Sequence, residues 1–368
     1  MTTDVTAPPR TIHAGFVGGG FMAAVHSRAA RAAGAALVGG TSSSAERSLD
    51  AARRLGLDHG YGSLDELLAD PDLDIVHVCT PNTTHAHLAR AVLEAGKHVI
   101  CEKPLATDAR DAAELAELAA ARGLVAAVPF VYRFHPMARE ARDLVARGGT
   151  GRVVSVHGAY LQDWLATPHD DDWRVDTAQG GPSRAFADIG SHLVDLLEFT
   201  SGDRIVRLNA LTRTVYDSRA TNTDIATEDL VAVVVELAGG AIGTLLVSQV
   251  APGHKNGLVL ELGGTDASVR FEQERPETLW VGRIDAASVV ARDPARLSPD
   301  AARLSLVPAG HPAGYQDAFN AFVADTYATV AGATRDGLPT FDDGVRAVRV
   351  TEAVLASAAS GAWVEVAS

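Results

Sequence analysis

Cysteine is scarce in this sequence. Only Cys79 and Cys101 occur among 368 residues, which is too few for a framework of disulfide bonds. Both lie in apolar, strand-like runs, where free buried cysteine is common. A small secreted domain held together by disulfides is therefore excluded.

Long apolar runs and an excess of basic residues are also missing. No stretch approaches the length of a transmembrane helix, and the first eleven residues, MTTDVTAPPRT, contain no apolar signal region. The formal net charge of −14 argues against nucleic acid or an anionic membrane surface as the main partner. Local donors can still hold a phosphorylated ligand. We therefore expect a cytoplasmic protein with no nucleic-acid or membrane partner.

The length and the hydrophobic pattern predict more than one domain. The chain is 47% apolar and 21% charged, as in an ordinary globular protein, and it is too long for one simple core. We expect residues 1–10, which are polar and contain proline, to be a disordered tail. From residue 12 to about residue 130, strands that are apolar throughout alternate with helices. This predicts a doubly wound parallel sheet, a Rossmann domain, over residues 11–130.

The pattern changes after residue 131. Strand-like runs recur between residues 204 and 283 with few helices between them, and two helices close the chain. Residues 284–312, rich in alanine, proline, aspartate and arginine, are expected to form a surface loop. Residues 131–368 are therefore predicted to form a second, α+β domain with an open antiparallel sheet.

A glycine-rich turn follows the first predicted strand. The pattern is Gly18-x-Gly20-x-x-Ala23, and it opens a helix. Gly18 permits a tight turn, Gly20 lets the backbone approach a pyrophosphate, and Ala23 lets helix and strand pack closely. The helix N-terminus adds N–H groups and a favourable dipole for phosphates. A purely structural turn is the alternative, but the strand–turn–helix context favours dinucleotide binding.

The end of the second predicted strand lacks an acidic residue. An aspartate or glutamate there would accept a hydrogen bond from the ribose 2′-hydroxyl and favour NAD. Instead, Ser42, Ser43 and Arg47 stand where they could accommodate a 2′-phosphate. The pattern allows NAD or NADP and leans toward NADP or use of both. The alternative is that Ser42–Ser44 only cap the next helix.

Two further segments carry polar groups suited to catalysis. Lys103 lies just past a predicted strand, at the carboxyl edge of the sheet, where ligands bind in open α/β folds. Asp188, His192 and Asp195 are spaced by four and three residues and would share one face of a helix. They form a satisfied polar face, a metal site or part of an active site. His192 and Asp195 have no third ligand at motif spacing, so we expect no metal.

Five segments in this order resemble the glucose–fructose oxidoreductase/inositol dehydrogenase family, called Gfo/Idh/MocA: GFVGGGFMAAVH, CTPNTTHAHLARAVLEAGKHVICEKPLA, YRFHPM, DWRVD and DIGSHLVDL. The resemblance spans residues 11–365. It implies a C-terminal domain with a large, mostly antiparallel sheet that commonly serves in homodimer or homotetramer assembly. It also implies hydride transfer between NAD(P) and a hydroxyl or carbonyl carbon of a sugar, anhydro-sugar, cyclitol or related polyol. A catalytically silent, nucleotide-sensing regulator of the same fold is the alternative.

The resemblance also implies roles for individual residues. It makes Lys103, Asp188 and His192 the catalytic positions. It assigns the cofactor to a phosphate loop, a nicotinamide-side segment and flanking residues: Gly18, Gly20, Phe21, Met22, Thr80, Pro81, Asn82, His85, Glu102, Lys103 and Arg174. A cis peptide bond often precedes the proline of Glu102-Lys103-Pro104 in this family. One departure is Val131, where the family often has asparagine.

The acid–base roles follow from the chemistry of alcohol oxidation, which removes a proton as the hydride leaves. We expect His192 to be the base, Asp188 to orient it, and Lys103 to bind and polarise the oxygen. The roles of His192 and Lys103 are interchangeable at this stage, and Asp195 is expected to be a structural partner. The substrate site is expected to use Lys103, Asp188 and His192 together with Tyr160, Gln162, Trp173 and Arg174.

Overall fold

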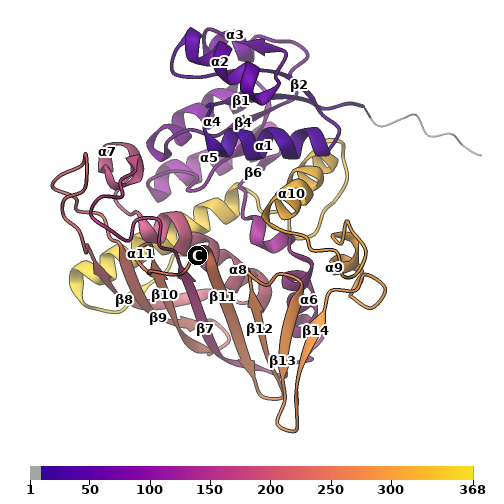
Figure 1. Ribbon diagram of the computed structural model, residues 1–368, viewed down its shortest axis with the longest axis vertical. Coiled ribbons are helices and arrows are strands. Elements are labelled where there is room, and N and C mark those ends of the chain that lie inside the picture. Colours follow the sequence, from indigo (N-terminus) through magenta and orange to yellow (C-terminus); the bar gives the residue numbers. More distant parts are fainter. Residues whose placement is uncertain (1–9, 368) are drawn as a thin grey trace, which may run out of the picture.

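The computed structural model describes residues 10–367, which form two β-sheets with helices around them (Figure 1). The first sheet has six strands in the order β3-β2-β1-β4-β5-β6, and all of its pairs are parallel. Its strands are β1 (His13–Val17), β2 (Ala36–Thr41), β3 (His59–Gly60), β4 (Ile75–Val78), β5 (His98–Cys101) and β6 (Ala126–Ala127). The predicted doubly wound parallel sheet is confirmed.

Helices cover both faces of this sheet, and local sequence sets their ends. They are α1 (Phe21–Ala32), α2 (Ala45–Leu55), α3 (Leu64–Leu68), α4 (His85–Glu94) and α5 (Ala109–Arg122), with a 3₁₀ turn η1 (Asn82–Thr84). Ser63 caps α3 by accepting from the Glu66 N–H at 3.1 Å, and the Glu66 carboxylate accepts from the Gly62 N–H at 2.8 Å. All four residues of β4 are buried, because helices lie on both sides of the strand.

The second sheet has nine strands in the order β14-β13-β12-β11-β7-β10-β9-β8-β15. Its pairs are antiparallel except that of β10 with β7, which is parallel. The strands are β7 (Val153–Leu161), β8 (Ile205–Arg213), β9 (Leu230–Leu237), β10 (Ile242–Ser248), β11 (Gly257–Gly264), β12 (Ser268–Glu272), β13 (Thr278–Gly282), β14 (Ala287–Ala291) and β15 (Val364–Glu365). The expectation of a large, mostly antiparallel open sheet is confirmed.

One expectation about this region is wrong. Residues 284–312 are not a continuous surface loop, because they contain strand β14 and the short helix α9 (Pro299–Arg303). The run Ser288-Val289-Val290 pairs with β13 and continues the sheet, and all five residues of β14 are exposed. An edge strand needs little burial to form, so an alanine- and aspartate-rich composition hid it.

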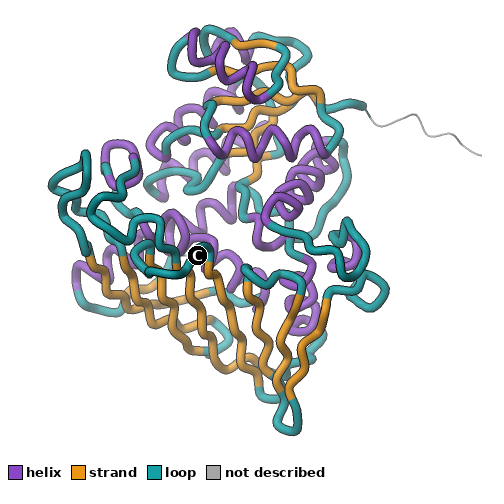
Figure 2. Tube along the Cα trace, viewed as in Figure 1, coloured by secondary structure: helices purple, strands orange, loops and turns teal. Residues whose placement is uncertain are grey.

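Helices line one face of the nine-stranded sheet, and the other face is left open. Figure 2 shows the strands in front of the helices. Along β9, Val231, Val233 and Val235 are buried while Ala232 and Val234 are exposed, so burial alternates between the two faces. The remaining helical elements are η2 (Val131–Phe134), α6 (Pro136–Ala146), η3 (Trp173–Val175), α7 (Thr177–Gly180), the π-helical turn η4 (Phe186–Gly190), α8 (Ser191–Ser201), α10 (Tyr315–Val330) and α11 (Phe341–Ser360).

Helix α10 comes late in the chain but packs against the parallel sheet. Its Phe319, Phe322 and Tyr327 belong to the same apolar core as Phe16 and Ala23 of the nucleotide-loop region. The domain division at residue 131 therefore stays a prediction. The predicted tail lies outside the described residues except for Arg10, whose guanidinium donates to Asp74 at 2.8 Å.

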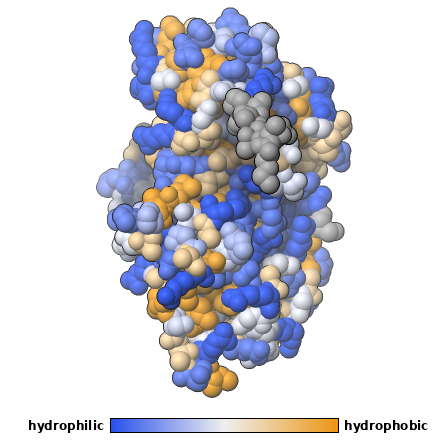
Figure 3. Space-filling view, turned by 90° about the vertical axis from the view of Figure 1, so that its right-hand side faces the viewer, coloured by the Kyte–Doolittle hydropathy of each residue, from blue (hydrophilic) through white to orange (hydrophobic). Residues whose placement is uncertain are grey.

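The described surface is mixed in character. Figure 3, seen from the side of β14, shows hydrophilic and hydrophobic residues interspersed over that face. Within residues 10–367, none of the helices is both long and apolar enough to cross a membrane.

Candidate active site

The glycine-rich turn has the shape that a pyrophosphate requires. Gly18 has a φ of +102°, and a Cβ there would lie 2.4 Å from the carbonyl oxygen of Cys79, so only glycine fits. Gly20 precedes α1 in extended backbone, and a Cβ at this position would meet open space. The first turn of α1 has no side-chain cap and no acidic residue, and its Phe21 is 74% exposed. The residues present thus fit an anionic dinucleotide at this helix N-terminus.

The tip of β2 carries hydroxyls and one guanidinium. Arg47 donates through Nη1 to the Ser43 hydroxyl at 3.0 Å, and the Ser42 N–H donates to Ser48 Oγ at 2.8 Å. The capping alternative holds for Ser44 alone, which accepts from the Arg47 N–H at 3.2 Å and begins α2. Arg47 is exposed and has no carboxylate partner among the described residues. The tip therefore offers positive charge where an adenosine ribose would lie.

The segment after β4 is bound tightly to the rest of the protein. The Asn82 amide donates to the carbonyl of Gly180 at 2.9 Å, which ties η1 to α7. His85 is buried, and its ring nitrogens lie 2.7 Å from the carbonyl oxygen of Pro104 and 2.8 Å from that of Thr80. Both side chains hold loops around the carboxyl edge of the sheet. Direct contact of Asn82 or His85 with a cofactor stays a prediction.

Lys103 reaches from the parallel sheet to Asp188 in the π turn η4. The peptide bond between Lys103 and Pro104 is cis, as the family resemblance implied. The Lys103 Nζ donates to Asp188 Oδ1 at 2.5 Å and to the Asp188 carbonyl oxygen at 3.0 Å. Lys103 and Asp188 are only 13% exposed, so this pair lies largely out of water.

Two more side chains complete the environment of Asp188. Gln249 donates to Asp188 Oδ2 at 2.7 Å, and Arg174 Nε lies 3.5 Å from Oδ1. Burial raises the pKa of Asp188, but Lys103 and Arg174 outweigh it and hold that pKa well below its usual range. Asp188 is therefore a carboxylate surrounded by donors.

His192 stands beside this group with a free ring nitrogen. Its ring packs edge-on against Phe130 and Tyr132, with centroids 5.6 and 5.0 Å away. The Nδ1 atom is buried and has no hydrogen-bond partner among the described residues. Burial and the nearby charge of Lys103 lower the pKa of His192 to about 3. His192 is therefore neutral at physiological pH. Its Nδ1 can accept or donate a hydrogen bond, depending on the tautomer, and no described protein group uses it.

Orientation of His192 by Asp188 stays a prediction. Within residues 10–367 no hydrogen bond joins the two side chains, because the Asp188 carboxylate accepts from Lys103 and Gln249 and has Arg174 nearby. Asp188 lies in the π turn Phe186–Gly190, just before α8 begins.

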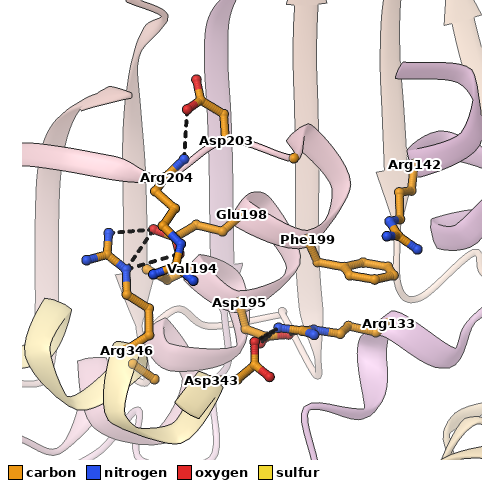
Figure 4. A pocket seen from close by; sticks show the side chains of 12 residues that line it. Arg133, Arg142, Val194, Asp195, Glu198, Phe199, Asp203, Arg204, Asp343 and Arg346 are labelled. Atoms are coloured by element: carbon orange, nitrogen blue, oxygen red, sulfur yellow. Dashed lines mark hydrogen bonds and ion pairs between the residues drawn. The ribbon is translucent and has the colours of Figure 1, made fainter. Parts of the chain in front are cut away.

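Asp195 lies in a separate cluster, as a structural partner. It accepts from Arg133 Nε at 2.8 Å and from Nη2 at 2.5 Å, and Arg133 also donates to Asp343 at 2.7 Å. A cavity of about 230 Å³ adjoins this cluster (Figure 4). Ion pairs such as Arg346–Glu198 at 2.7 Å line it, and it contains neither Lys103 nor His192. The cavity is therefore separate from the Lys103–Asp188 pair and from His192.

Predicted substrate residues meet in a network that extends from this site. Tyr160 and Gln162 both donate to Asn256 Oδ1, at 2.6 and 2.9 Å, and the Asn256 amide donates to the Tyr132 hydroxyl at 3.2 Å. Arg174 lies over the ring of Trp173, 4.4 Å from its centroid. The arrangement offers aromatic faces and amide groups next to the Lys103–Asp188 pair.

Sequence reasoning missed Gln249 and Asn256. Gln249 is fully buried just after β10, and its Oε1 lacks a partner among the described residues. The available signal was a polar residue at the end of an apolar strand, which is weak because such residues commonly start turns. In the described part of the chain, no three histidine, cysteine, aspartate or glutamate side chains gather as a metal site.

Comparison with family models defines the class first. Residues 12–130 match the oxidoreductase family with an NAD-binding Rossmann fold, and residues 138–270 match the GFO/IDH/MocA C-terminal domain. The protein is thus an oxidoreductase with an NAD-binding Rossmann domain. Together the two matches cover most of the chain, and it belongs to the Gfo/Idh/MocA family.

Individual proteins of this class are similar to the present protein over almost its whole length. Levoglucosan dehydrogenase of Pseudarthrobacter phenanthrenivorans is 30% identical, covering 97% of this chain and 98% of that protein. The structure of levoglucosan dehydrogenase with NADH and levoglucosan has a TM-score of 0.90 at 30% identity, over 97% of this chain and 100% of that one. An inositol dehydrogenase homolog from Azotobacter vinelandii, complexed with NADH and myo-inositol, has a TM-score of 0.86 at 30% identity, over 97% and 98%. The chain is an NAD(P)-dependent oxidoreductase acting on CH–OH groups.

Proposed function

We propose that the protein oxidises a ring hydroxyl of a sugar, anhydro-sugar or cyclitol, and that Lys103, Asp188 and His192 carry out the proton chemistry. The observation that carries the proposal is the grouping of a lysine–aspartate pair with a neutral histidine whose Nδ1 has no partner among the described residues. This group lies at the carboxyl edge of the parallel sheet, beyond the nucleotide turn. Levoglucosan and myo-inositol, bound in the related structures, are the first compounds to test.

In this mechanism each protein group has a separate task. When bound, the nicotinamide accepts a hydride from the carbon that carries the reacting hydroxyl. Lys103 donates to the hydroxyl oxygen and stabilises the negative charge that develops on it. His192 takes the hydroxyl proton, because a neutral imidazole has a lone pair for it. Asp188 holds the Lys103 ammonium in place.

The surrounding network suits a polyhydroxylated ring. Trp173 supplies an apolar face for ring C–H groups, while Gln162 and Arg174 supply donors and acceptors for the other hydroxyls. Tyr160 is only 2% exposed and supports the site through its hydrogen bond to Asn256. Glu102, Thr80, Pro81 and Met22 are assigned to the cofactor side of the same site. A substrate hydroxyl that donates to the free Oε1 of Gln249 would satisfy that buried atom.

Both nicotinamide cofactors are included in the proposal. The NAD-binding family match supports NAD, and the Arg47–Ser43 pair supports additional acceptance of NADP, because a guanidinium there can bind a 2′-phosphate. The related chains include both NADH-bound enzymes and an NADP-linked D-xylose dehydrogenase.

The open face of the nine-stranded sheet is proposed to form a homodimer or homotetramer. Apolar side chains stand exposed on neighbouring strands of this sheet, among them Leu211, Val234 and Ile242. Light scattering of the intact protein and of Ile242→Lys tests this. A monomer for the parent protein would contradict the proposed assembly.

A panel assay tests the proposed reaction. Purified protein is mixed with NAD or NADP and a set of sugars and cyclitols, and the absorbance of the reduced cofactor is followed. Turnover of at least one ring polyol is expected, and its abolition in Lys103→Met is the matched control. NADH binding without turnover on a broad panel would instead favour the nucleotide-sensing alternative.

A further inference from the structure

Four buried side chains form a continuous hydrogen-bonded chain behind the active site. The Tyr327 hydroxyl lies 2.8 Å from His77 Nε2, and His77 Nδ1 lies 2.8 Å from His26 Nδ1. His26 Nε2 in turn lies 2.9 Å from Glu102 Oε1. The four residues come from α10, β4, α1 and the end of β5, and each is at most 5% exposed. None of these contacts involves the groups assigned to proton chemistry.

The Tyr327 hydroxyl determines which atom donates in each hydrogen bond between Tyr327 and Glu102. Among the described residues, the buried Tyr327 hydroxyl contacts only His77, so it must donate to His77 Nε2 to avoid an unpaired donor. His77 then carries its hydrogen on Nδ1 and donates it to His26. His26 therefore carries its own hydrogen on Nε2 and donates it to Glu102. Each hydrogen bond polarises the next, and the last donor, His26 Nε2–H, meets the Glu102 carboxylate.

Glu102, held by His26, also binds the backbone of Lys103. Its second oxygen, Oε2, accepts from the backbone N–H of Lys103 at 3.1 Å. On the other side of the lysine, the carbonyl oxygen of Pro104 is held by His85 at 2.7 Å. The backbone of Lys103 is thus fixed on both sides, and its Nζ is directed at Asp188.

We propose that Tyr327, His77 and His26 are positioning residues that fix Lys103 through the Glu102 carboxylate. The proposal rests on the function proposed for Lys103. It gives the late helix α10 a part in the active site through Tyr327. Burial acts against a charged Glu102, but the His26 contact outweighs it and lowers the pKa of Glu102.

A pair of variants at one position separates positioning from simple packing. His26→Leu removes the donor to Glu102, while His26→Gln keeps an amide donor at that place. We expect His26→Leu to lower kcat about 10- to 100-fold, as for misplaced catalytic groups, with KM and NADH affinity changed less than about threefold. His26→Gln should recover kcat to within about threefold of the parent. Equal loss in both variants would overturn the proposal.

The hydrogen positions can be measured without any turnover. In ¹⁵N NMR spectra of histidine-labelled protein, His26 should carry its hydrogen on Nε2 and His77 on Nδ1. Tyr327→Phe should change the signals of both rings. Thr326→Val is the matched control, because it removes a buried hydrogen bond to Phe322 from the same helix and should leave both rings unchanged. The opposite tautomers in the parent protein would overturn the proposal, whereas absent turnover with these tautomers would count against the enzyme function alone.

Discussion

Two groups of buried histidines behave differently in this protein. His26 and His77 use every ring nitrogen in a chain that ends on Glu102. His192, which is also buried, packs against the rings of Phe130 and Tyr132 and leaves Nδ1 without a partner within the described residues. All three would look alike in a sequence, as histidines within apolar segments.

The difference in hydrogen bonding distinguishes histidines that support the structure from a histidine that can take part in a reaction. A buried polar atom without a partner costs free energy, so a fold keeps one where a ligand or a reaction uses it. A fully bonded histidine instead fixes its neighbours. This comparison agrees with the roles proposed above, in which His192 takes part in proton transfer and His26 and His77 position Lys103.

Replacing His192 should have the largest effect on activity. His192→Ala is expected to lower kcat about 10²- to 10⁴-fold, because it removes the proton acceptor. The melting temperature should also fall, because loss of the buried ring leaves a cavity beside Phe130 and Tyr132, so kcat is compared at a temperature where both proteins are folded. Steady-state kinetics and thermal unfolding measure the two quantities. Unchanged turnover with cofactor still bound would remove His192 from the mechanism.

Replacing His77 should affect the stability of the fold more directly than the chemical step. His77→Leu leaves Tyr327 and His26 with buried, unpaired polar atoms. We expect the free energy of unfolding to fall by about 2 to 5 kcal/mol, measured by urea denaturation. His87→Leu is the control, because His87 is exposed, and it should stay within about 0.5 kcal/mol. Equal stability of the two variants would contradict the importance of the chain.

Acid should weaken the fold before the carboxylates titrate. Burial lowers the pKa of His77 and His85, of His135 to about 4, and of His192 to about 3, while the unfolded chain takes up these protons near pH 6.5. Their folded pKa values are depressed, so stability is complete above pH 6.5 and falls as the pH drops toward 4. Each group contributes up to about 1.4 kcal/mol per pH unit.

Urea denaturation at pH 7.5, 6 and 5 measures this slope. His135→Phe removes one of the four groups, and its slope should be shallower than that of the parent protein. A stability that is constant between pH 7.5 and 5 would mean that these rings bind protons equally in the folded and unfolded states.

The smallest effect is expected at the exposed end of the cofactor site. Arg47→Ala should raise KM for NADP about tenfold and leave KM for NAD unchanged, because one charge-assisted hydrogen bond is lost. Ser44→Ala, which removes only the helix cap, is the control for a general disturbance of α2. Equal changes for both cofactors would show that Arg47 does not distinguish them.

The sequence predicted the features that depend on local spacing. The turn at Gly18 and Gly20, the alternating strands and helices, and the cis Lys103–Pro104 bond of the family resemblance are all present. These follow from residue types at fixed separations or from a motif. Local residues also set several helix ends: Ser44 caps the start of α2, and Gly56 and Gly123, with left-handed backbone, follow the ends of α2 and α5.

Features that depend on tertiary context could not be predicted in this way. The spacing of Asp188 and His192 indicated one helical face, but it could not show that the Asp188 carboxylate accepts from Lys103 and Gln249, which are distant in the sequence. The chain from Tyr327 to Glu102 joins residues more than 200 positions apart, and no local pattern marks it. Strand β14 was hidden by its composition.

The return of α10 to the parallel sheet has a consequence for synthesis on the ribosome. The segment up to β6 leaves the ribosome first. At that point the apolar side of α1 that α10 later covers is still exposed. That partner, which includes Phe319 and Phe322, is translated almost 200 residues after β6. The nucleotide-binding half therefore waits with an uncovered surface until the second sheet has been made, and a truncation before residue 315 would leave it prone to aggregate.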